Sequence, residues 1–301
     1  MDWITGIQNA VNYIETHLAD EIDYDLAAKE SFSSTHHFQR VFSILCGYTL
    51  GEYIRNRRLS LAGTELATGK EKVIDIAAKY GYDSPDSFAK AFQKFHGITP
   101  SQARNGAVLK SFSRLTIKII LEGGSIMDYK IEEKPEMLLT GYKKRFSGDP
   151  NAKNDQDHNF ACENRVLQYI LEGMSREHVI TYQVLTNFGP DGYDFYFAYE
   201  LPHWALEDFD HDLGEMAKKF NHIRIPAGQY LVCQTKRCMF PMALGDDLRR
   251  KAVTEWLPSA GYELRLAPEI GVIHWPFEDG NEEVNHSHYC ELWIPVMKKN
   301  T

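Results

Sequence analysis

Hydrophobic residues recur every three or four positions through the first hundred residues, the spacing of one buried face of an α-helix. Thr49 and Glu52 have the spacing of a capping box, and Ser84-Pro85 places a capping residue before a proline at the first helical position. This part is therefore predicted to be all-α, with helices over about 24–31, 34–45, 50–67, 73–80 and 85–96. The first apolar stripe consists of Trp3, Ile7, Val11, Ile14 and Leu18.

From about residue 127 the pattern changes to short runs rich in aromatic and β-branched residues, which favour strands. Strands are predicted over 129–131, 137–142, 179–186, 193–200, 230–235 and 289–296, and helices over about 159–174 and 246–256. Gaps of hairpin length indicate an α+β fold on a largely antiparallel sheet. The fold class is thus multidomain: an all-α domain over 1–105, a linker over 106–126 with a β-leaning run at 115–121, and an α+β domain over 127–301.

Composition excludes several classes of protein. The chain has 301 residues, 43% hydrophobic and 25% charged, which is typical of globular domains and not of a disordered chain. A net charge of −9 argues against a strongly basic nucleic-acid coat, so DNA binding needs a local cationic face. No stretch is apolar enough to span a membrane. Five scattered cysteines without a C-x-x-C pair suit a reducing compartment, and the first twenty residues lack Lys and Arg, so we expect a cytoplasmic protein without a signal peptide.

The helical part contains one pattern twice, and the pattern is that of a helix-turn-helix. The first copy runs from Leu26-Ala27 through Ser34-x-x-x-Phe38-x-Arg40-x-Phe42. The second runs from Ile76-Ala77 through Ser84-x-x-x-Phe88-x-Lys90-x-Phe92. The two phenylalanines of each copy are four residues apart and share a buried face, while the basic residue between them projects elsewhere.

The helix between the two copies sets their separation. Eighteen residues give about 27 Å at 1.5 Å per residue, and adjacent major grooves on one DNA face lie about 34 Å apart. One chain could therefore place both second helices in adjacent major grooves of double-stranded DNA. The alternative is a helical bundle whose packing is merely repeated.

Residues 1–105 resemble the DNA-binding domain of AraC/XylS-type transcription regulators, in the N-terminal placement of the MarA/Rob branch. The resemblance rests on Arg57-Arg58-Leu59-x-x-Ala62, Ile76-Ala77-x-x-x-Gly81-Tyr82, Phe88-x-x-x-Phe92-x-Lys94 and Gly97-Ile98-Thr99-Pro100. It implies base-edge contacts from His36, Gln39, Arg40, Ser87 and Lys90, and phosphate contacts from Thr35, Arg57 and Ser84. Pro85 and Asp86 depart from the family pattern, and Asp86 would repel a phosphate, so the first copy is expected to read more of the sequence than the second.

Residues from about 127 onward resemble the GyrI-like effector-binding domain of Rob-type and BmrR-type regulators. The segments that carry the resemblance are 128–135, Ile225-Pro226-Ala227-Gly228-x-Tyr230, 256–263 and Glu291-Leu292-Trp293-Ile294-Pro295-Val296. The resemblance implies two strand–helix–strand–strand modules, over 127–215 and 216–301, whose sheet holds a small molecule. Together the two resemblances imply a transcription activator controlled by a small hydrophobic or cationic effector, with RNA polymerase as a further partner and no cofactor.

Strand alternation sharpens the effector site. In the last predicted strand, Tyr289, Glu291 and Trp293 share one face, and Cys290 with its even-numbered neighbours shares the other. A carboxylate between two aromatic rings suits a lipophilic cation, through charge pairing and cation–π contact. The alternative is a solvent-facing glutamate on an edge strand. Further aromatic candidates for the wall of the site are Tyr142, Tyr193, Phe195, Trp204 and Trp275.

The sequence offers residues for two other chemistries, a metal site and a hydrolase. His286-x-His288-x-Cys290 offers three metal ligands on one strand, but a zinc site needs a fourth ligand, and a cysteine facing the core would take both histidines with it. No metal is therefore expected. Some GyrI-like domains resemble hydrolases, in which a glutamate placed like Glu291 would act as a general base on an electrophilic ligand. The functional alternative is thus a small-molecule hydrolase fused to a DNA-binding domain.

Overall fold

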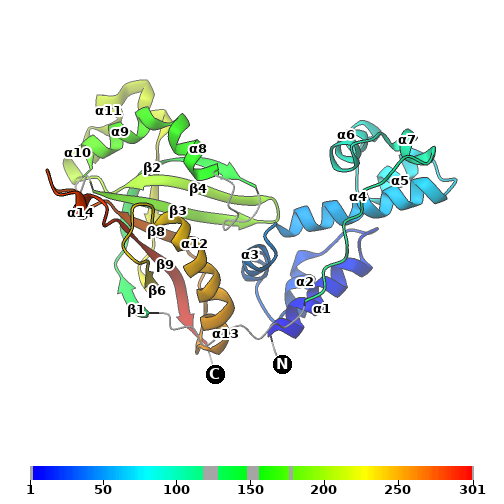
Figure 1. Cartoon of the computed structure of the whole chain (residues 1–301), viewed down its shortest axis with the longest axis horizontal. Coiled ribbons are helices and arrows are strands. Elements are labelled where there is room, and N and C mark those ends of the chain that lie inside the picture. Colours follow the sequence, from blue (N-terminus) through cyan, green and yellow to red (C-terminus); the bar gives the residue numbers. More distant parts are fainter. Residues whose placement is uncertain (1–2, 118–127, 148–155, 176–178, 300–301) are drawn as a thin grey trace. The chain divides into compact units, whose positions relative to one another are not determined.

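The structure is a computed structural model that describes residues 3–117, 128–147, 156–175 and 179–299 (Figure 1). The chain forms two compact units, an N-terminal unit of helices and a C-terminal unit built on a sheet. The predicted fold class, all-α followed by antiparallel α+β, is confirmed. Within the described ranges, no helix combines the length and the apolar content that a bilayer crossing requires.

The N-terminal unit has the predicted helices, with bounds close to those expected from the caps. They are α1 (Trp3–Thr16), α2 (Tyr24–Glu30), α3 (Thr35–Cys46), α4 (Leu50–Thr68), α5 (Val73–Lys79), α6 (Pro85–His96) and α7 (Pro100–Arg104). The capping box that begins α4 is complete, since the Thr49 hydroxyl accepts from the Glu52 N–H and the Glu52 carboxylate accepts from the Thr49 N–H. Ser84 caps α6, and Gly97 ends it in the left-handed conformation at φ 80°.

Helix α4 contributes to the hydrophobic cores of both helix-turn-helix motifs. On its C-terminal half, Leu59 and Leu66 pack with Ile76 of α5 and with Phe88 and Phe92 of α6. On its N-terminal half, the fully buried Tyr53 ring lies 5.8 Å from the ring of Phe42 in α3. With 19 residues the helix is about 28 Å long, so it separates the two motifs by a fixed distance.

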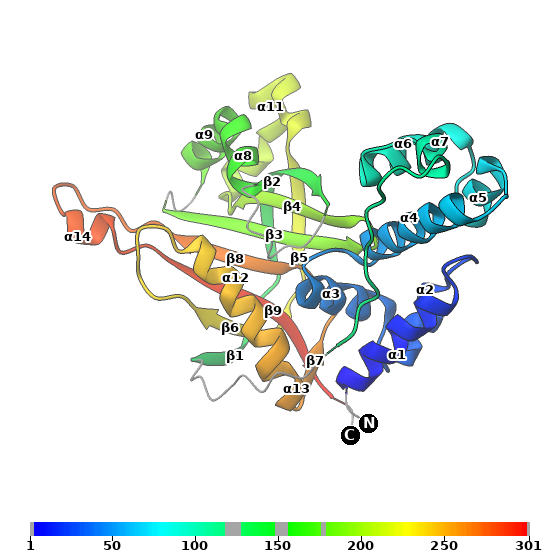
Figure 2. The ribbon, with the colours of Figure 1, turned by 45° about the vertical axis from the view of Figure 1, so that its right-hand side comes forward.

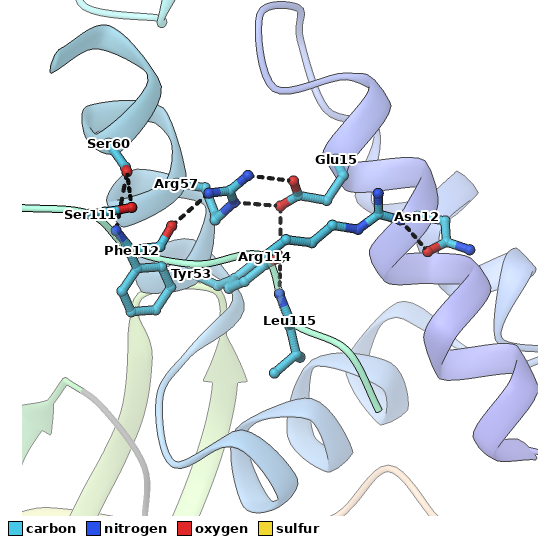
Figure 3. Close-up of polar contacts among 9 residues, drawn as sticks. All are labelled: Asn12, Glu15, Tyr53, Arg57, Ser60, Ser111, Phe112, Arg114 and Leu115. Atoms are coloured by element: carbon cyan, nitrogen blue, oxygen red, sulfur yellow. Dashed lines mark hydrogen bonds and ion pairs between the residues drawn. The ribbon is translucent and has the colours of Figure 1, made fainter. Parts of the chain in front are cut away.

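After α7 the chain runs in an extended form along the helices, and we call residues 107–117 the strap (Figure 3). Its backbone N–H groups donate to side chains of α6, α4 and α1 in turn, so the strap ties α6 and α1 to the central helix α4. The bonds are Lys110 to His96 Nδ1 (3.1 Å), Phe112 to Ser60 Oγ (3.1 Å), Leu115 to Tyr53 Oη (3.1 Å) and Ile117 to Gln8 Oε1 (2.8 Å).

The strap corrects part of the linker prediction. Residues 107–117 belong to the helical unit instead of serving as a free connection, because their amides are bonded to its helices. Residues 115–117 of the predicted β-leaning run form no strand. Residues 118–126 of the predicted linker lie outside the described residues.

An ion pair in the helical unit joins α1, α4 and the strap (Figure 3). The Arg57 guanidinium donates two hydrogen bonds of 2.8 Å to the carboxylate of Glu15 and one of 2.6 Å to the carbonyl of Phe112. The side chains of Arg57 and Glu15 are only 12% and 8% exposed. Burial by itself would raise the pKa of Glu15, but the hydrogen bonds from Arg57 and Tyr53 outweigh it and lower that pKa.

The C-terminal unit contains an antiparallel sheet of nine strands in the described residues. They are β1 (Tyr129–Lys134), β2 (Met137–Phe146), β3 (Ile180–Gly189), β4 (Gly192–Tyr199), β5 (Asn221–Ile225), β6 (Gly228–Gln234), β7 (Tyr262–Leu264), β8 (Glu269–His274) and β9 (Tyr289–Lys298). Their spatial order is β1-β6-β9-β8-β3-β4-β2-β5, with β7 paired to the end of β9. The order is symmetric about the β3–β8 pair, and each half exchanges its first strand with the other: β1 pairs with β6, and β5 with β2.

The strands predicted from the sequence did not include β5, β7 and β8, and one predicted helix is two helices in the structure. The predicted helix over 159–174 is divided at Asn164 into α8 (Gln156–Glu163) and α9 (Arg165–Met174). The predicted helix over 246–256 begins earlier, as α12 (Met242–Lys251), and continues as a π-helical turn, Ala252–Trp256. The remaining helical segments are short: α10 (His203–Glu207), α11 (Phe209–Leu213), the 3₁₀ turn Gly214–Lys219, α13 (Leu257–Ser259) and α14 (Glu282–Asn285).

Helices α8, α9 and α12 pack on one face of this sheet (Figure 2). Phe160 and Leu171 of the helices contact Phe195 and Phe197 of β4, and Gly245 of α12 lies against Cys290 of β9. Across the sheet, Phe197 pairs with Gln183, Gln183 with Gly271, and Gly271 with Leu292. Paired residues share a face, and so do residues two apart on one strand, so Phe195, Phe197 and Cys290 lie on the same face. Arg249 of α12 is buried there between the carboxylates of Glu269 and Asp246.

The Arg57–Glu15 pair gives a testable prediction. In Arg57→Met the buried Glu15 carboxylate loses its cation, which costs about 3 kcal/mol for a buried pair, and the strap loses a donor. We expect peptides covering residues 107–117 to exchange their amide hydrogens up to about a hundredfold faster in mass spectrometry of the full chain. Lys79→Met, which breaks an exposed pair with Glu65, should change exchange by less than about fivefold. Unchanged exchange of the strap in Arg57→Met would contradict this account.

The imidazole of His96 gives a pH prediction. Its Nδ1 accepts from Lys110, so its Nε2 carries the proton and donates to the Leu59 carbonyl at 3.0 Å. Burial lowers the pKa of His96 below its ordinary 6.5, against the effect of the Leu59 hydrogen bond. The unfolded chain therefore takes up the proton first, and this stabilisation is complete above pH 6.5 and is lost as the pH falls below it. Urea unfolding from about pH 7.5 to about pH 5.5 should show a smaller loss of stability in His96→Gln than in the wild type. Equal losses of stability in the two proteins would contradict this role of His96.

Candidate DNA-binding and effector-binding sites

The second helix-turn-helix motif presents its predicted contact residues to solvent. Ser84, Ser87 and Lys90 are exposed, while Phe88 and Phe92 of the same helix are fully buried. The Ser84 hydroxyl accepts from the Ser87 N–H at 3.2 Å, which fixes the first turn of α6. This helix therefore offers two exposed lysines, Lys90 and Lys94, and two hydroxyls on a rigid, capped frame.

The first motif has the same frame but a different exposure. Gln39 and Arg40 are 7% and 1% exposed, and the Thr35 hydroxyl donates to the carboxylate of Asp25. Burial, assisted by the charge of Arg40, lowers the pKa of His36 to about 4, so its imidazole is neutral near pH 7. That the first motif reads more sequence than the second stays a prediction.

The phosphate contact that the family resemblance implied for Arg57 stays a prediction, and the geometry of this side chain weighs against it. Its guanidinium is bonded to Glu15 and to the Phe112 carbonyl, and its side chain is only 12% exposed. A phosphate would have to displace a buried carboxylate from these bonds. We therefore assign Arg57 to the helical framework. The position gave no local sign of this role, because Glu15 lies 42 residues away in the sequence.

In the C-terminal unit, the sheet face opposite α8, α9 and α12 carries a second aromatic core, which we call the aromatic face. Register places Val184 opposite Tyr196 and Ile270, and Ile270 opposite Trp293. Glu291 and Tyr289 follow on the same face of β9, as the alternation predicted, and Cys290 lies on the helix-covered face. The aromatic face consists of Leu139, Tyr182, Val184, Tyr196, Ala198, Ile225, Tyr230, Val232, Ile270, Val272 and Trp293.

Glu291 and Trp293 are joined directly. The Trp293 indole N–H donates to the Glu291 carboxylate at 2.9 Å, which fixes both side chains at one place on the face. The ring of Tyr289 stacks on that of His274 at 4.2 Å, with the Arg237 guanidinium 4.4 Å from the Tyr289 ring centroid. Glu291, Tyr289 and His274 are half-buried, so the carboxylate lies at the margin of the apolar core.

Cations lie over three rings of the aromatic face, which sequence reasoning missed. The Lys143 ammonium is 5.6 Å from the ring centroid of Tyr196. The Lys134 ammonium is 4.0 Å from the ring centroid of Trp293, and the Arg265 guanidinium is 5.1 Å from that of Tyr230. The Glu132 carboxylate bridges Lys130 and Lys134, at 2.5 and 2.6 Å. The alternating charges of Lys130, Glu132 and Lys134 could have placed these three side chains on one face of β1. The contact of Lys134 with Trp293 depends on a residue 159 positions later and leaves no local sign.

The other predicted effector-binding residues do not join Glu291. Tyr142, Tyr193 and Phe195 lie in the core beneath α8 and α9, on the helix-covered face. Trp275 donates to Thr181 Oγ1 at 3.2 Å, and Thr181 contacts Tyr199 of the same core. Trp204 is exposed on α10. Both faces of the sheet are rich in aromatic residues, as Phe195, Tyr196 and Phe197 of β4 show, so residue type alone did not distinguish the faces.

The histidine–cysteine motif near β9 has no metal-site geometry in the described residues. His288 pairs with Cys238 across a β-bridge, and its Nδ1 lies 3.0 Å from the Met239 carbonyl. Cys290 lies in the core, where burial raises its pKa to about 12. Among the described residues, no three His, Cys, Asp or Glu side chains converge as a metal site would need.

Each half of the chain is similar to a known protein family. A family model described as helix-turn-helix domain matches residues 27–106, and one described as integron-associated effector binding protein matches residues 130–296, more than half of the chain. The HTH-type transcriptional activator AarP of Providencia stuartii is 45% identical over 98 residues, which cover 33% of this chain and 73% of AarP. Regulatory protein SoxS of Salmonella typhimurium is 39% identical over 99 residues, 33% of this chain and 92% of SoxS.

Among solved structures, that of SAV2435 bound to tetraphenylphosphonium aligns with 57% of this chain and 94% of its own, with 15% identity and a TM-score of 0.39. The two family models lie in the order of the two structural units and account for most of the described residues. The chain therefore belongs to the AraC-type helix-turn-helix transcription regulators and carries a C-terminal effector-binding domain of the integron-associated family.

Proposed function

We propose that this regulator reads an asymmetric DNA site with its two helix-turn-helix motifs and activates transcription when a small hydrophobic or cationic effector binds to its C-terminal domain. The observation that carries the proposal is the pairing of two motifs on one capped helix with a Glu291–Trp293 pair at the margin of an aromatic face. The activator role follows the relative AarP, which is named a transcriptional activator. Contact with RNA polymerase belongs to the same proposal.

On the DNA side, Lys90 and Ser87 of α6 enter one major groove, and Ser84 with the N-terminus of α6 meets a phosphate. His36, Gln39 and Arg40 of α3 enter the adjacent groove, with Thr35 near the DNA backbone. The length of α4, about 28 Å, supports reading of two grooves on one DNA face.

On the effector side, the Glu291 carboxylate pairs with a cationic group and the Trp293 and Tyr289 rings contact its apolar part. The indole N–H of Trp293 holds the carboxylate in place, so the carboxylate need not reorganise when the ligand arrives. A ligand can favour one state of the protein only through different affinities for the two states. The effector must therefore bind more tightly to the form that activates transcription.

The DNA proposal is tested by binding of the full chain to its own upstream duplex and to a scrambled duplex, by fluorescence anisotropy across salt concentrations. Lys90→Ala and Arg40→Ala should each weaken binding to the upstream duplex by at least about fivefold, since a good base contact provides about 1–3 kcal/mol. Lys219→Ala, an exposed lysine of the C-terminal unit, is the charge-matched control and should change binding by less than about twofold. Equal, weak binding to both duplexes would exclude a sequence-specific reader.

The effector proposal is tested by calorimetry with tetraphenylphosphonium, a lipophilic cation, and with triphenylphosphine oxide, an uncharged relative. Glu291→Gln keeps the shape of the side chain and removes its charge, so we expect about tenfold weaker binding of the cation and little change for the oxide. Glu283→Gln, at an exposed position, is the matched control. If the wild-type chain binds neither probe, or if Glu291→Gln binds the cation as tightly as the wild type, the assigned site is wrong.

A further inference from the structure

The ring of Trp293 already has a cation of the protein above it. The Lys134 ammonium lies 4.0 Å from the ring centroid, well inside the range of a cation–π contact. Trp293 is 7% exposed and the Lys134 side chain 18% exposed, so the contact is largely withdrawn from water. A desolvated contact of this kind is stronger than one at an open surface.

The same ammonium has a second partner that it can keep. Glu132, two residues earlier on β1, contacts Lys134 at 2.6 Å and Lys130 at 2.5 Å, and its own side chain is 30% exposed. If Lys134 leaves the ring of Trp293, it can remain paired with Glu132 near the solvent. A buried charge without a partner would make the exchange at the ring too costly. Because Lys134 keeps Glu132, the exchange leaves no such charge.

The ring that Lys134 covers belongs to the residue that holds Glu291. The Trp293 indole donates to the Glu291 carboxylate at 2.9 Å, so a cation over this ring and a cation at Glu291 would lie within one small site. Two like charges that close repel each other, and each lowers the affinity of the site for the other.

We propose that Lys134 is a built-in competitor of the effector: its ammonium occupies the Trp293 ring, and a lipophilic cation binds there by exchange for it. This inference rests on the proposed function. Small inorganic or short alkyl cations gain no more from the ring than Lys134 does, and they lack its tether. A cation displaces Lys134 only if it also buries apolar surface, because that burial supplies the additional binding free energy. Lys134 therefore selects bulky lipophilic cations.

The exchange also has a structural consequence. Lys134 ends β1, an edge strand that pairs only with β6 in the described sheet and is the first strand after the strap in sequence. Removal of Lys134 from Trp293 takes away a contact between β1 and β9, a strand two places further into the sheet. Effector binding thus changes the attachment of the strand that lies closest in sequence to the DNA-binding unit.

The test is calorimetric titration of the full chain with tetraphenylphosphonium and with triphenylphosphine oxide. Lys134→Met keeps the length of the side chain and removes its charge, so the cation should bind about tenfold more tightly than to the wild type. The oxide should gain less than about threefold, because no charge is exchanged. The matched control is Lys130→Met, which removes the other lysine bound to Glu132, and it should change cation affinity by less than about threefold.

The outcomes separate this inference from the function it rests on. Unchanged or weaker cation binding in Lys134→Met, with normal binding by the wild type, overturns the competition and leaves the effector site in place. An equal gain for both probes also overturns it, since Lys134 would then be only a steric cover. If neither the wild type nor Lys134→Met binds the cation, both proposals fail. Far-ultraviolet circular dichroism of each variant excludes misfolding as the cause of a lost response.

Discussion

Helix α4 is the constraint on which the arrangement of the DNA-binding unit depends, because neither helix-turn-helix motif closes a core without it. Its C-terminal half completes the core around Phe88 and Phe92, and its N-terminal half completes the aromatic cluster around Phe42. A motif of two short helices buries too little apolar surface to be stable alone. Sharing one helix therefore provides stability and spacing together, and the strap and the Arg57–Glu15 pair hold the shared helix to its neighbours at both ends.

The sheet of the C-terminal unit follows a different constraint, since its two faces have different requirements. One face is filled by α8, α9 and α12, and its charged group, Arg249, is balanced by Glu269 and Asp246. The other face has rings and aliphatic side chains at its centre and charges at its margin, including Glu291, Glu132 and Lys134. A face of this composition can accept a molecule with an apolar body and a charged end, whereas the helix-covered face cannot without losing its helices.

The helix bounds of the N-terminal half could be predicted almost to the residue, because the signals that begin and end each helix are local in the sequence. Thr49 and Glu52 are three residues apart, and Ser84 lies beside Pro85, so each cap is visible in a short window. The strand β8 was missed because its apolar run is short, contains Gly271 and begins only after the charged Glu269. The buried carboxylate is tolerated only through Arg249, twenty residues earlier on α12.

The candidate sites divide in the same way. Strand alternation was enough to place Glu291 and Trp293 on one face, since the period of a strand is a local property. It was not enough for Tyr142, Tyr193 and Phe195, because β4 carries aromatic residues on both faces and only the packing of α8 and α9 decides which face is covered. The family resemblance likewise gave Arg57 a phosphate contact, while the fold gives it Glu15. Long-range ion pairs are the part of the structure that local patterns did not reveal.

These ion pairs also differ in how readily they can be exchanged, and the difference follows from solvation. Arg57 and Glu15 form a two-point contact with side chains 12% and 8% exposed, so separating them strands two charges in a medium that solvates them poorly. Lys134 and Glu132 form a one-point contact with side chains 18% and 30% exposed, and Lys130 stands by as a second cation. The Arg57–Glu15 pair therefore stays closed in the folded protein. The second pair can stay intact while Lys134 moves from the Trp293 ring toward the solvent, at small cost. Under the proposed function, that property is needed at the site of the effector and not in the helix that spaces the two helix-turn-helix motifs.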